Sequence, residues 1–199
     1  MKILIIGGNG TIGKKVTEYF DQDNEVIIAG RNSGDEQVDI AQSDSIKALF
    51  KRVGKLDAII NICGDAKWAP FNDLSEEDYQ IGLQSKLMGQ VNLVRIGCKY
   101  LNPNGSITLS TGILADHPVL MTASAAMVNG GIHSFVKAVS LELDKELRVN
   151  AVSLGLVEDA YEKYKDYFVG HQPITMKDAV AAYVSSVDSD KNGEIIKAY

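Results

Sequence analysis

The sequence predicts an α/β protein in which one parallel, doubly wound sheet carries helices on both of its faces. Residues 3–6 form an apolar run without alternation, as expected for a strand that is buried on both sides. Three evenly spaced glycines follow this run, and an amphipathic helical stretch begins immediately after them. Further along the chain, short β-rich runs alternate with helical stretches as far as residue 196, which is the pattern of a Rossmann-type sheet.

The glycine turn predicts a binding site for a dinucleotide. Gly7 permits a tight turn after the first strand, Gly10 lets the backbone approach a pyrophosphate, and Gly13 lets the helix pack closely on the strand. The helix N-terminus adds free N–H groups and the positive end of the helix dipole. An ordinary tight turn between a strand and a helix is the alternative. The residues expected to contact the cofactor here are Gly7, Asn9, Gly10, Thr11, Ile12 and Gly13.

The composition is that of a single globular domain. The 199 residues suffice for one sizeable core, so residues 1–199 are expected to form one NAD(P)-binding domain. The net charge of −6 gives no reason to expect a nucleic-acid or membrane partner. Cys63 and Cys98 have no metal-ligand spacing, so no metal is expected. There is no apolar run of transmembrane length and no signal-peptide pattern, so a cytoplasmic location is expected.

The end of the second predicted strand, which spans residues 25–29, indicates the form of the dinucleotide. In this fold that end lies beside the adenosine ribose, where an acidic residue bonds a 2′-hydroxyl and an arginine accommodates a 2′-phosphate. Arg31 therefore favours NADP(H) over NAD(H), with Asn32 and Ser33 as further donors. The alternative is that Arg31 is a solvated surface residue.

One flanking helix is expected to be missing after this strand. Residues 37–40 predict a short third strand whose last residues, Asp39 and Ile40, lie beside the cofactor, with Asp39 accepting from the adenine amino group. Only seven residues separate Arg31 from Asp39, whereas a crossover with a helix needs about a dozen or more. The connection is therefore predicted to be a loop.

Apolar spacing and capping residues predict the remaining elements. Ser75 is the expected N-cap of a helix that runs to about residue 100, with Asp78 completing a capping box. The other expected elements are helices over residues 43–53, 122–143 and 176–187, strands over 57–60, 106–109, 148–152 and 194–196, a turn over 103–105 and a loop over 153–173.

Four short motifs occur along the chain in an informative order. They are Gly7-x-x-Gly10-x-x-Gly13, Asn61-Ile62-Cys63-Gly64, the stretch from Arg148 to Gly155, and Gly193-Glu194-Ile195-Ile196. In this order they resemble the short-chain dehydrogenase/reductase family over essentially the whole chain, although Leu154 replaces a proline of the family's pattern. The resemblance implies a nicotinamide cofactor and adds Asn61, Cys63, Gly64, Asn129, Gly155 and Val157 to its expected contacts.

The family's catalytic positions match poorly. The resemblance implies an active site of Asn, Ser, Tyr and Lys, in which the Tyr exchanges a proton with the substrate oxygen and the Lys lowers the pKa of that Tyr. Alignment on the end of the catalytic helix places Ala125 at the Tyr position and Asn129 at the Lys position. Lys86 falls at the Asn position, and Ser110 or Thr111 at the Ser position. The expected catalytic residues are therefore Ser110, Thr111 and Lys86.

Side chains of the expected loop over residues 153–173 could replace the missing proton donor. Tyr161 and Lys165 form a Tyr-x-x-x-Lys string, which we interpret as chance because it follows the sixth strand. Tyr164, Tyr167 and His171 could fold over the nicotinamide, or could simply pack a lid.

Two functions are compatible with these observations. The first is an NADP-dependent oxidoreductase that transfers hydride to or from a small carbonyl compound or alcohol, with a changed proton donor. The second is a catalytically impaired NADP(H)-binding sensor or interaction protein. A homologue that binds no nucleotide is a weaker third alternative. The helices over residues 76–100 and 122–143 correspond to the family's dimer-forming pair, so the resemblance implies a homodimer or homotetramer.

Overall fold

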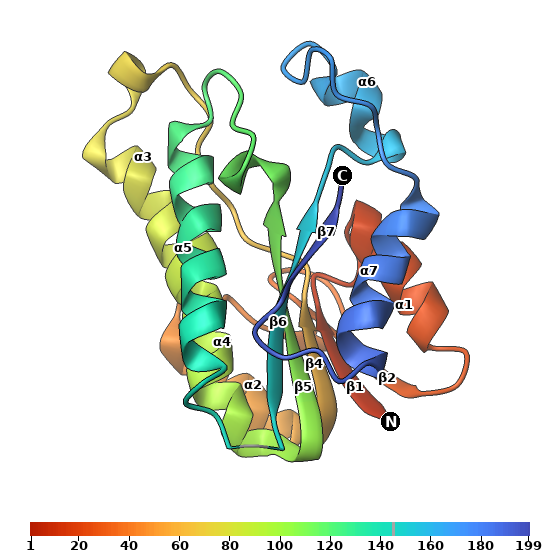
Figure 1. Ribbon diagram of the computed structural model, residues 1–199. Coiled ribbons are helices and arrows are strands. Elements are labelled where there is room, and N and C mark those ends of the chain that lie inside the picture. Colours follow the sequence, from red (N-terminus) through yellow and green to blue (C-terminus); the bar gives the residue numbers. More distant parts are fainter. Residues whose placement is uncertain (145) are drawn as a thin grey trace.

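The computed structural model describes residues 1–144 and 146–199, and its centre is a seven-stranded parallel sheet (Figure 1). The strand order is β3-β2-β1-β4-β5-β6-β7, so the chain reverses direction across the sheet between β1 and β4. Ligands of such sheets bind at the carboxyl ends of the strands near this point. The strands span Lys2–Ile6 (β1), Glu25–Gly30 (β2), Glu36–Gln37 (β3), Leu56–Asn61 (β4), Leu101–Gly112 (β5), Arg148–Leu154 (β6) and Ile195–Ala198 (β7). The predicted fold class is confirmed.

Helices cover both faces of the sheet (Figure 1). One face carries α2 (Ser43–Val53), α4 (Gln90–Gly97) and α5 (Ala123–Val139), and the other carries α1 (Thr11–Phe20) and α7 (Met176–Asp188). The alternate residues of β1 explain this arrangement, because Leu4 and Ile6 enter the first core and Ile3 and Ile5 enter the second. The shorter helical elements are η1 (Phe71–Asp73), α3 (Glu76–Ile81), the π-helix η2 (Gly82–Gly89), η3 (Cys98–Tyr100), η4 (Ile113–Ala115), η5 (Glu158–Ala160) and α6 (Tyr161–Tyr164).

The predicted capping box at Ser75 is confirmed. The Ser75 hydroxyl accepts a hydrogen bond from the backbone N–H of Asp78 at 3.2 Å. The Asp78 carboxylate in turn accepts one from the backbone N–H of Ser75 at 3.1 Å. This reciprocal pair starts the helical segment that runs from α3 through η2 and α4.

Within the described residues, no helix has both the length and the apolar character needed to cross a membrane.

Three predicted elements have different bounds in the structure. The third strand covers only Glu36–Gln37 instead of residues 37–40, because the Asp39 carboxylate accepts from the Ala41 N–H and turns the chain away. The helix expected to reach residue 143 ends at Val139, where the N–H groups of Leu141 and Glu142 bond to carbonyls three residues earlier. The loop over residues 153–173 contains η5 and α6, which its tyrosine-rich sequence did not reveal.

Of two other expectations about the sheet, one is confirmed and one is wrong. The chain between β2 and β3 forms no helix in the described residues, so this crossover is a short loop. The turn predicted over residues 103–105 is not found, because these residues belong to β5, although the strand is irregular there: Leu101 pairs with Leu56 whereas Ser106 already pairs with Ala58. Asn104 there has a φ of 63°, in the left-handed region that asparagine tolerates.

Candidate active site at the carboxyl edge of the sheet

The turn between β1 and α1 has the geometry of an anion-binding turn. Gly7 has a φ of 86°, which glycine adopts without strain. A Cβ atom on Gly13 would overlap the carbonyl oxygen of Gly7, so only glycine lets α1 pack this close to the turn. The N-cap residue, Gly10, offers no side-chain hydrogen bond to the first turn of α1. The first N–H groups of this helix are therefore suited to a phosphate.

A cavity of about 340 Å³ lies beside this turn, at the ends of β1, β2 and β4. The Asn9 side-chain amide donates to the Ser33 hydroxyl at 3.2 Å and joins the glycine turn to the loop after β2. Thr11, Gly13, Asn32, Asp39 and Asn61 are not part of the lining. The predicted cofactor residues that do line it are Gly7, Asn9, Gly10, Arg31, Ser33, Ile40, Cys63 and Gly64.

Arg31 reaches this cavity as a partly paired cation. Its guanidinium lies 3.8 Å from a carboxylate oxygen of Asp39 and 3.6 Å from one of Asp65. The three side chains are 56%, 39% and 69% exposed, and exposed pairs of this kind contribute only about 0–1 kcal/mol to stability. Either contact can therefore be exchanged for a phosphate at little cost.

Gln90, which belongs to none of the sequence motifs, connects the ends of β4 and β5. Its side-chain oxygen accepts from the Asn61 amide at 3.1 Å and from the backbone N–H of Ser110 at 2.8 Å. Its side-chain nitrogen donates to the carbonyls of Ser110 at 2.9 Å and of Lys86 at 3.0 Å. Asn61 is thus a structural link below the cavity, and its amide also bonds the Cys63 carbonyl at 2.8 Å.

The two hydroxyls expected at the catalytic serine position are both engaged by the protein. Ser110 bonds the Asn61 carbonyl and lies 2.7 Å from the Tyr183 hydroxyl, on the side of the sheet that α7 covers. Thr111 points to the opposite side, where its hydroxyl lies 2.8 Å from Nε2 of His133. Burial lowers the pKa of His133, with Asp116 opposing the shift. Thr111 also lines a cavity of about 280 Å³, but its hydroxyl is already hydrogen-bonded to the His133 imidazole.

The structure brings Lys86, Thr111, Ala125 and Asn129 together around a second cavity of about 280 Å³. This cavity shares Gly64 and Asp65 with the cavity of about 340 Å³ beside the glycine turn, which we call the nucleotide cavity, so the two are adjacent. Asn129 is 5% exposed, and its side-chain oxygen is buried with no hydrogen-bond partner among the residues that the structure describes. Burial lowers the pKa of the Lys86 amine. Burial also raises the pKa of the Cys63 thiol to about 11, so the thiol stays protonated and redox chemistry there is not expected.

Aromatic side chains close this end of the molecule. A third cavity, of about 400 Å³, shares Lys86, Trp68 and Tyr164 with the second, and Ile12, Gly155 and Val157 are in its lining. The Trp68 ring lies 5.7 Å from that of Tyr164 and 6.3 Å from that of Phe168. Trp68 and Phe168 are additions to the sequence-based candidates, whereas Tyr164 was among them.

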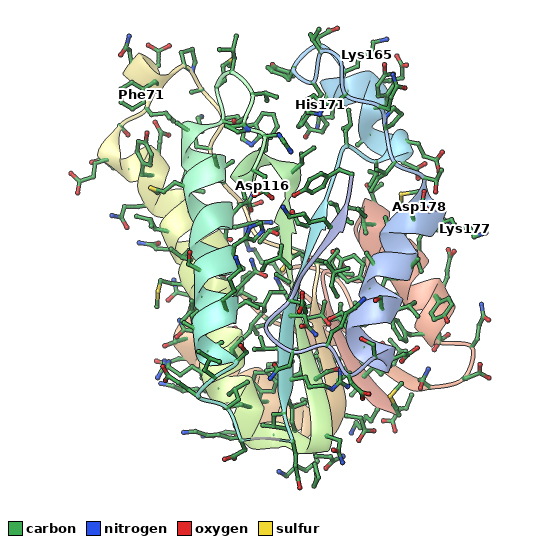
Figure 2. The ribbon with its side chains drawn as sticks, in the orientation of Figure 1. Phe71, Asp116, Lys165, His171, Lys177 and Asp178 are labelled. Atoms are coloured by element: carbon green, nitrogen blue, oxygen red, sulfur yellow. The ribbon has the colours of Figure 1, made fainter. Side chains whose placement is uncertain are left out.

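The Tyr-x-x-x-Lys string at Tyr161 and Lys165 does not form a catalytic pair facing the cavity. Lys165 lies at the outer end of the α6 segment (Figure 2), where its ammonium bonds the Glu162 carboxylate at 2.6 Å. His171, labelled in the same view, packs against Phe168 with the ring centroids 5.8 Å apart. The loop residues therefore form a packed aromatic cover.

Comparison with known proteins agrees with this geometry. A family model described as "Enoyl-(Acyl carrier protein) reductase" matches residues 17–182. The chain belongs to the short-chain dehydrogenase/reductase family. Members of this family are oxidoreductases that use a nicotinamide cofactor.

Three similar proteins illustrate the relationship. The "3-oxoacyl-[acyl-carrier-protein] reductase FabG" of Thermotoga maritima is 26% identical over 180 residues, which cover 78% of this chain and 73% of that protein. The crystal structure of the protein lin1944 from Listeria innocua is 41% identical, with a TM-score of 0.98 and full coverage of both chains. A small-chain dehydrogenase in complex with NADPH is 26% identical, with a TM-score of 0.88, covering all of this chain and 96% of that one.

The short-chain dehydrogenase residues present here fit a nicotinamide dinucleotide. Two observations carry this: the close packing at Gly7 and Gly13, which leaves room for a pyrophosphate, and the unpartnered buried oxygen of Asn129, which suits a ribose hydroxyl. When bound, the cofactor supplies or accepts a hydride.

Proposed function

We propose that the protein is an NADP(H)-dependent oxidoreductase that transfers hydride between the cofactor and a small carbonyl compound or alcohol. The observation that carries the proposal is the run of adjacent cavities from the glycine turn to the aromatic cover, with the buried side-chain oxygen of Asn129 unpartnered between them. A nicotinamide ribose at Asn129 would direct the reactive ring into the cavity beneath Trp68 and Tyr164.

The preference for NADP(H) rests on Arg31. A 2′-phosphate would replace the Asp65 contact of the guanidinium, and a hydrogen bond to a charged group contributes roughly 1.5–3 kcal/mol. Ser33, which lines the same cavity, is a further donor. The NADPH complex of the similar small-chain dehydrogenase is consistent with this choice. The proposed cofactor contacts are the predicted residues that line the three cavities, namely Gly7, Asn9, Gly10, Ile12, Arg31, Ser33, Ile40, Cys63, Gly64, Asn129, Gly155 and Val157.

A second candidate function is an NADP(H)-binding sensor with little or no turnover. It is favoured by the observation that the Thr111 hydroxyl is already bonded to His133, and by the expected alignment, which puts the cavity-lining residues Ala125 and Asn129 at the family's tyrosine and lysine positions. Loss of a positioned general acid lowers rate by about 10²–10⁴-fold, which leaves room for either function.

We also propose that the protein assembles as a homodimer or homotetramer through the helical face formed by α3, η2 and α5. Ile81, Met88 and Met127 lie on these helices and are 44%, 46% and 44% exposed. A monomeric mass in solution at micromolar concentration would contradict this assembly.

Binding calorimetry with NADPH and NADH tests the cofactor proposal. Wild type is expected to bind NADPH more tightly, and Arg31→Ala is expected to lose about tenfold or more for NADPH with little change for NADH. Arg52→Ala is the matched control, because Arg52 pairs with Glu36 outside the cavity lining. Equal affinity of wild type for both cofactors would contradict the preference. NADPH oxidation with a panel of simple aldehydes and ketones then separates the enzyme from the sensor.

A further inference from the structure

Lys86 is a cavity-lining cation that the proposed cofactor contacts do not use. Its side chain lines the cavities of about 280 and 400 Å³, which together we call the reaction end of the site. Within residues 1–144 and 146–199, no hydrogen bond or ion pair of its ammonium is found. The side chain is only partly exposed, and a cation that loses part of its water without gaining a partner is disfavoured, so the amine is placed to meet a ligand group or to release its proton.

The protein positions Lys86 with several contacts. Gln90 bonds its carbonyl at 3.0 Å, and the neighbouring Ser85 hydroxyl accepts from the Asp65 N–H at 3.1 Å. A Cβ atom on Gly64 would lie 3.0 Å from Cδ and 3.1 Å from Cα of Lys86, so the aliphatic stem lies directly on the loop that lines the nucleotide cavity. The residue also sits inside η2, and π-helical turns occur frequently at functional sites.

The other cavity-lining groups are poor proton donors. Ala125 carries no acidic proton, and the neutral amide of Asn129 does not titrate. The Thr111 hydroxyl is bonded to His133 and to the Val152 carbonyl. Two further groups line these cavities: Asp65, which is paired with Arg31, and Tyr164, whose ring packs on Trp68 in the aromatic cover.

We propose that the Lys86 ammonium is the proton donor to the carbonyl oxygen of the substrate, an inference that rests on the proposed oxidoreductase function. The carbonyl carbon accepts a hydride from the reduced nicotinamide, and the π electrons of the C=O bond move to oxygen. That oxygen takes a proton from Nζ of Lys86. The products are the alcohol, NADP⁺ and a neutral amine, which regains a proton from water. The apolar and aromatic walls formed by Leu114, Trp68 and Tyr164 suit a small ketone or aldehyde with an apolar flank.

The electrostatic surroundings of Lys86 suit this role. Burial lowers the pKa of its amine, which moves the group toward the range in which a general acid works near neutral pH. The titratable groups that face it are the Cys63 thiol, the Asp65 carboxylate and the Tyr164 hydroxyl, of which the first two oppose the shift. Asp65 is itself paired with Arg31, which weakens its pull on the amine.

Reduction of acetaldehyde, cyclohexanone, benzaldehyde and ethyl acetoacetate by NADPH tests the inference. Lys86→Met is expected to lower kcat/KM by about 10²–10⁴-fold while the Kd for NADPH changes by less than threefold. Lys67→Met, at an exposed lysine close in the chain, is the matched control and is expected to leave kcat/KM unchanged. In wild type, kcat/KM should fall as pH rises and the amine loses its proton. In Lys86→Arg the guanidinium keeps its positive charge as pH rises, so kcat/KM of this variant should be lower than that of wild type but should not fall with pH.

Competitive acetylation of the apoprotein supplies a readout that needs no turnover. Acetic anhydride is expected to modify Lys86 at a lower pH than the exposed Lys67, as read by mass spectrometry, and NADPH is expected to protect it. Reduction that survives in Lys86→Met but is lost in Tyr164→Phe would overturn the inference and assign the proton to Tyr164. If wild type binds NADPH but reduces none of the four compounds, the proposed function fails and this inference fails with it.

Discussion

The two ends of this site differ in the atoms that line them: the nucleotide end, beside the glycine turn, is lined largely by backbone atoms, and the reaction end, around Lys86, is lined by side chains. At the nucleotide end, the close packing of Gly7 and Gly13 and the uncapped start of α1 make a surface of backbone atoms. At the reaction end, the side chains of Lys86, Thr111 and Asn129 converge from three separate elements. A backbone surface tolerates little change at its glycines, whereas a side-chain surface can exchange its residues while the fold persists. The alignment expected from the family resemblance has the same division, since it matches the glycine turn but puts Ala125 and Asn129 at the catalytic tyrosine and lysine positions.

The largest effect is expected from the network beneath the reaction end. Gln90→Leu removes four hydrogen bonds. The buried N–H and carbonyl groups of Ser110 then lose their hydrogen bonds to this side chain. We expect the free energy of unfolding to fall by about 3–5 kcal/mol, since each unsatisfied buried group costs roughly 1–3 kcal/mol. Urea unfolding measures this. Gln84→Leu, at an exposed position of the same helix, should stay within about 0.5 kcal/mol of wild type. Equal effects of the two substitutions would show that the network is dispensable.

A smaller but more selective effect is expected at the nucleotide end. Gly13→Ala places a Cβ atom against the carbonyl of Gly7, and overpacking of this kind costs about 1–3 kcal/mol. The turn must shift to relieve the overlap, so NADPH affinity should fall by at least tenfold. Gly130→Ala is the matched control, because a Cβ there meets no atom within 4 Å and a helical glycine-to-alanine change stabilises by about 0.5–1 kcal/mol. Thermal unfolding and NADPH fluorescence titration measure both quantities. Unchanged NADPH affinity in Gly13→Ala would argue against a backbone-built cradle.

The smallest effect is expected behind the reaction cavity, at His133. Burial lowers its pKa below the ordinary value of 6.5, so the unfolded chain binds a proton at a higher pH than the folded protein does. Stability should therefore decline as pH falls below about 6.5, and the free energy of unfolding in His133→Gln should decline less steeply over that interval. Urea unfolding between pH 7.5 and pH 5 is the measurement. Parallel pH profiles of wild type and variant would mean that other groups dominate the acid sensitivity.

The oxidoreductase and sensor functions differ at the reaction end alone. Both require the glycine turn, the nucleotide cavity and Arg31, so cofactor binding does not separate them. A hydride-transfer assay separates the two functions, and Lys86 is the residue whose role as a proton donor decides between them. The comparison of the two ends thus reduces the functional question to one side chain and one assay.

Much of the fold and of the nucleotide end follows from the sequence alone. The unbroken apolar run of β1, the glycine spacing and the Ser75–Asp78 capping box are local patterns, in which neighbouring residues specify the conformation. The short crossover after β2 follows from chain length. Such features require no knowledge of which distant segments meet.

Only the tertiary structure decided the reaction end. Gln90 joins β4 and β5, Thr111 contacts His133 on α5, and Trp68 packs on Tyr164, all between segments far apart in the chain. The direction of a strand side chain also separated Ser110 from Thr111, because successive residues point to opposite faces of the sheet. These side chains take their roles from the atoms that surround them, and those neighbours are set by the packing of the whole sheet and its helices.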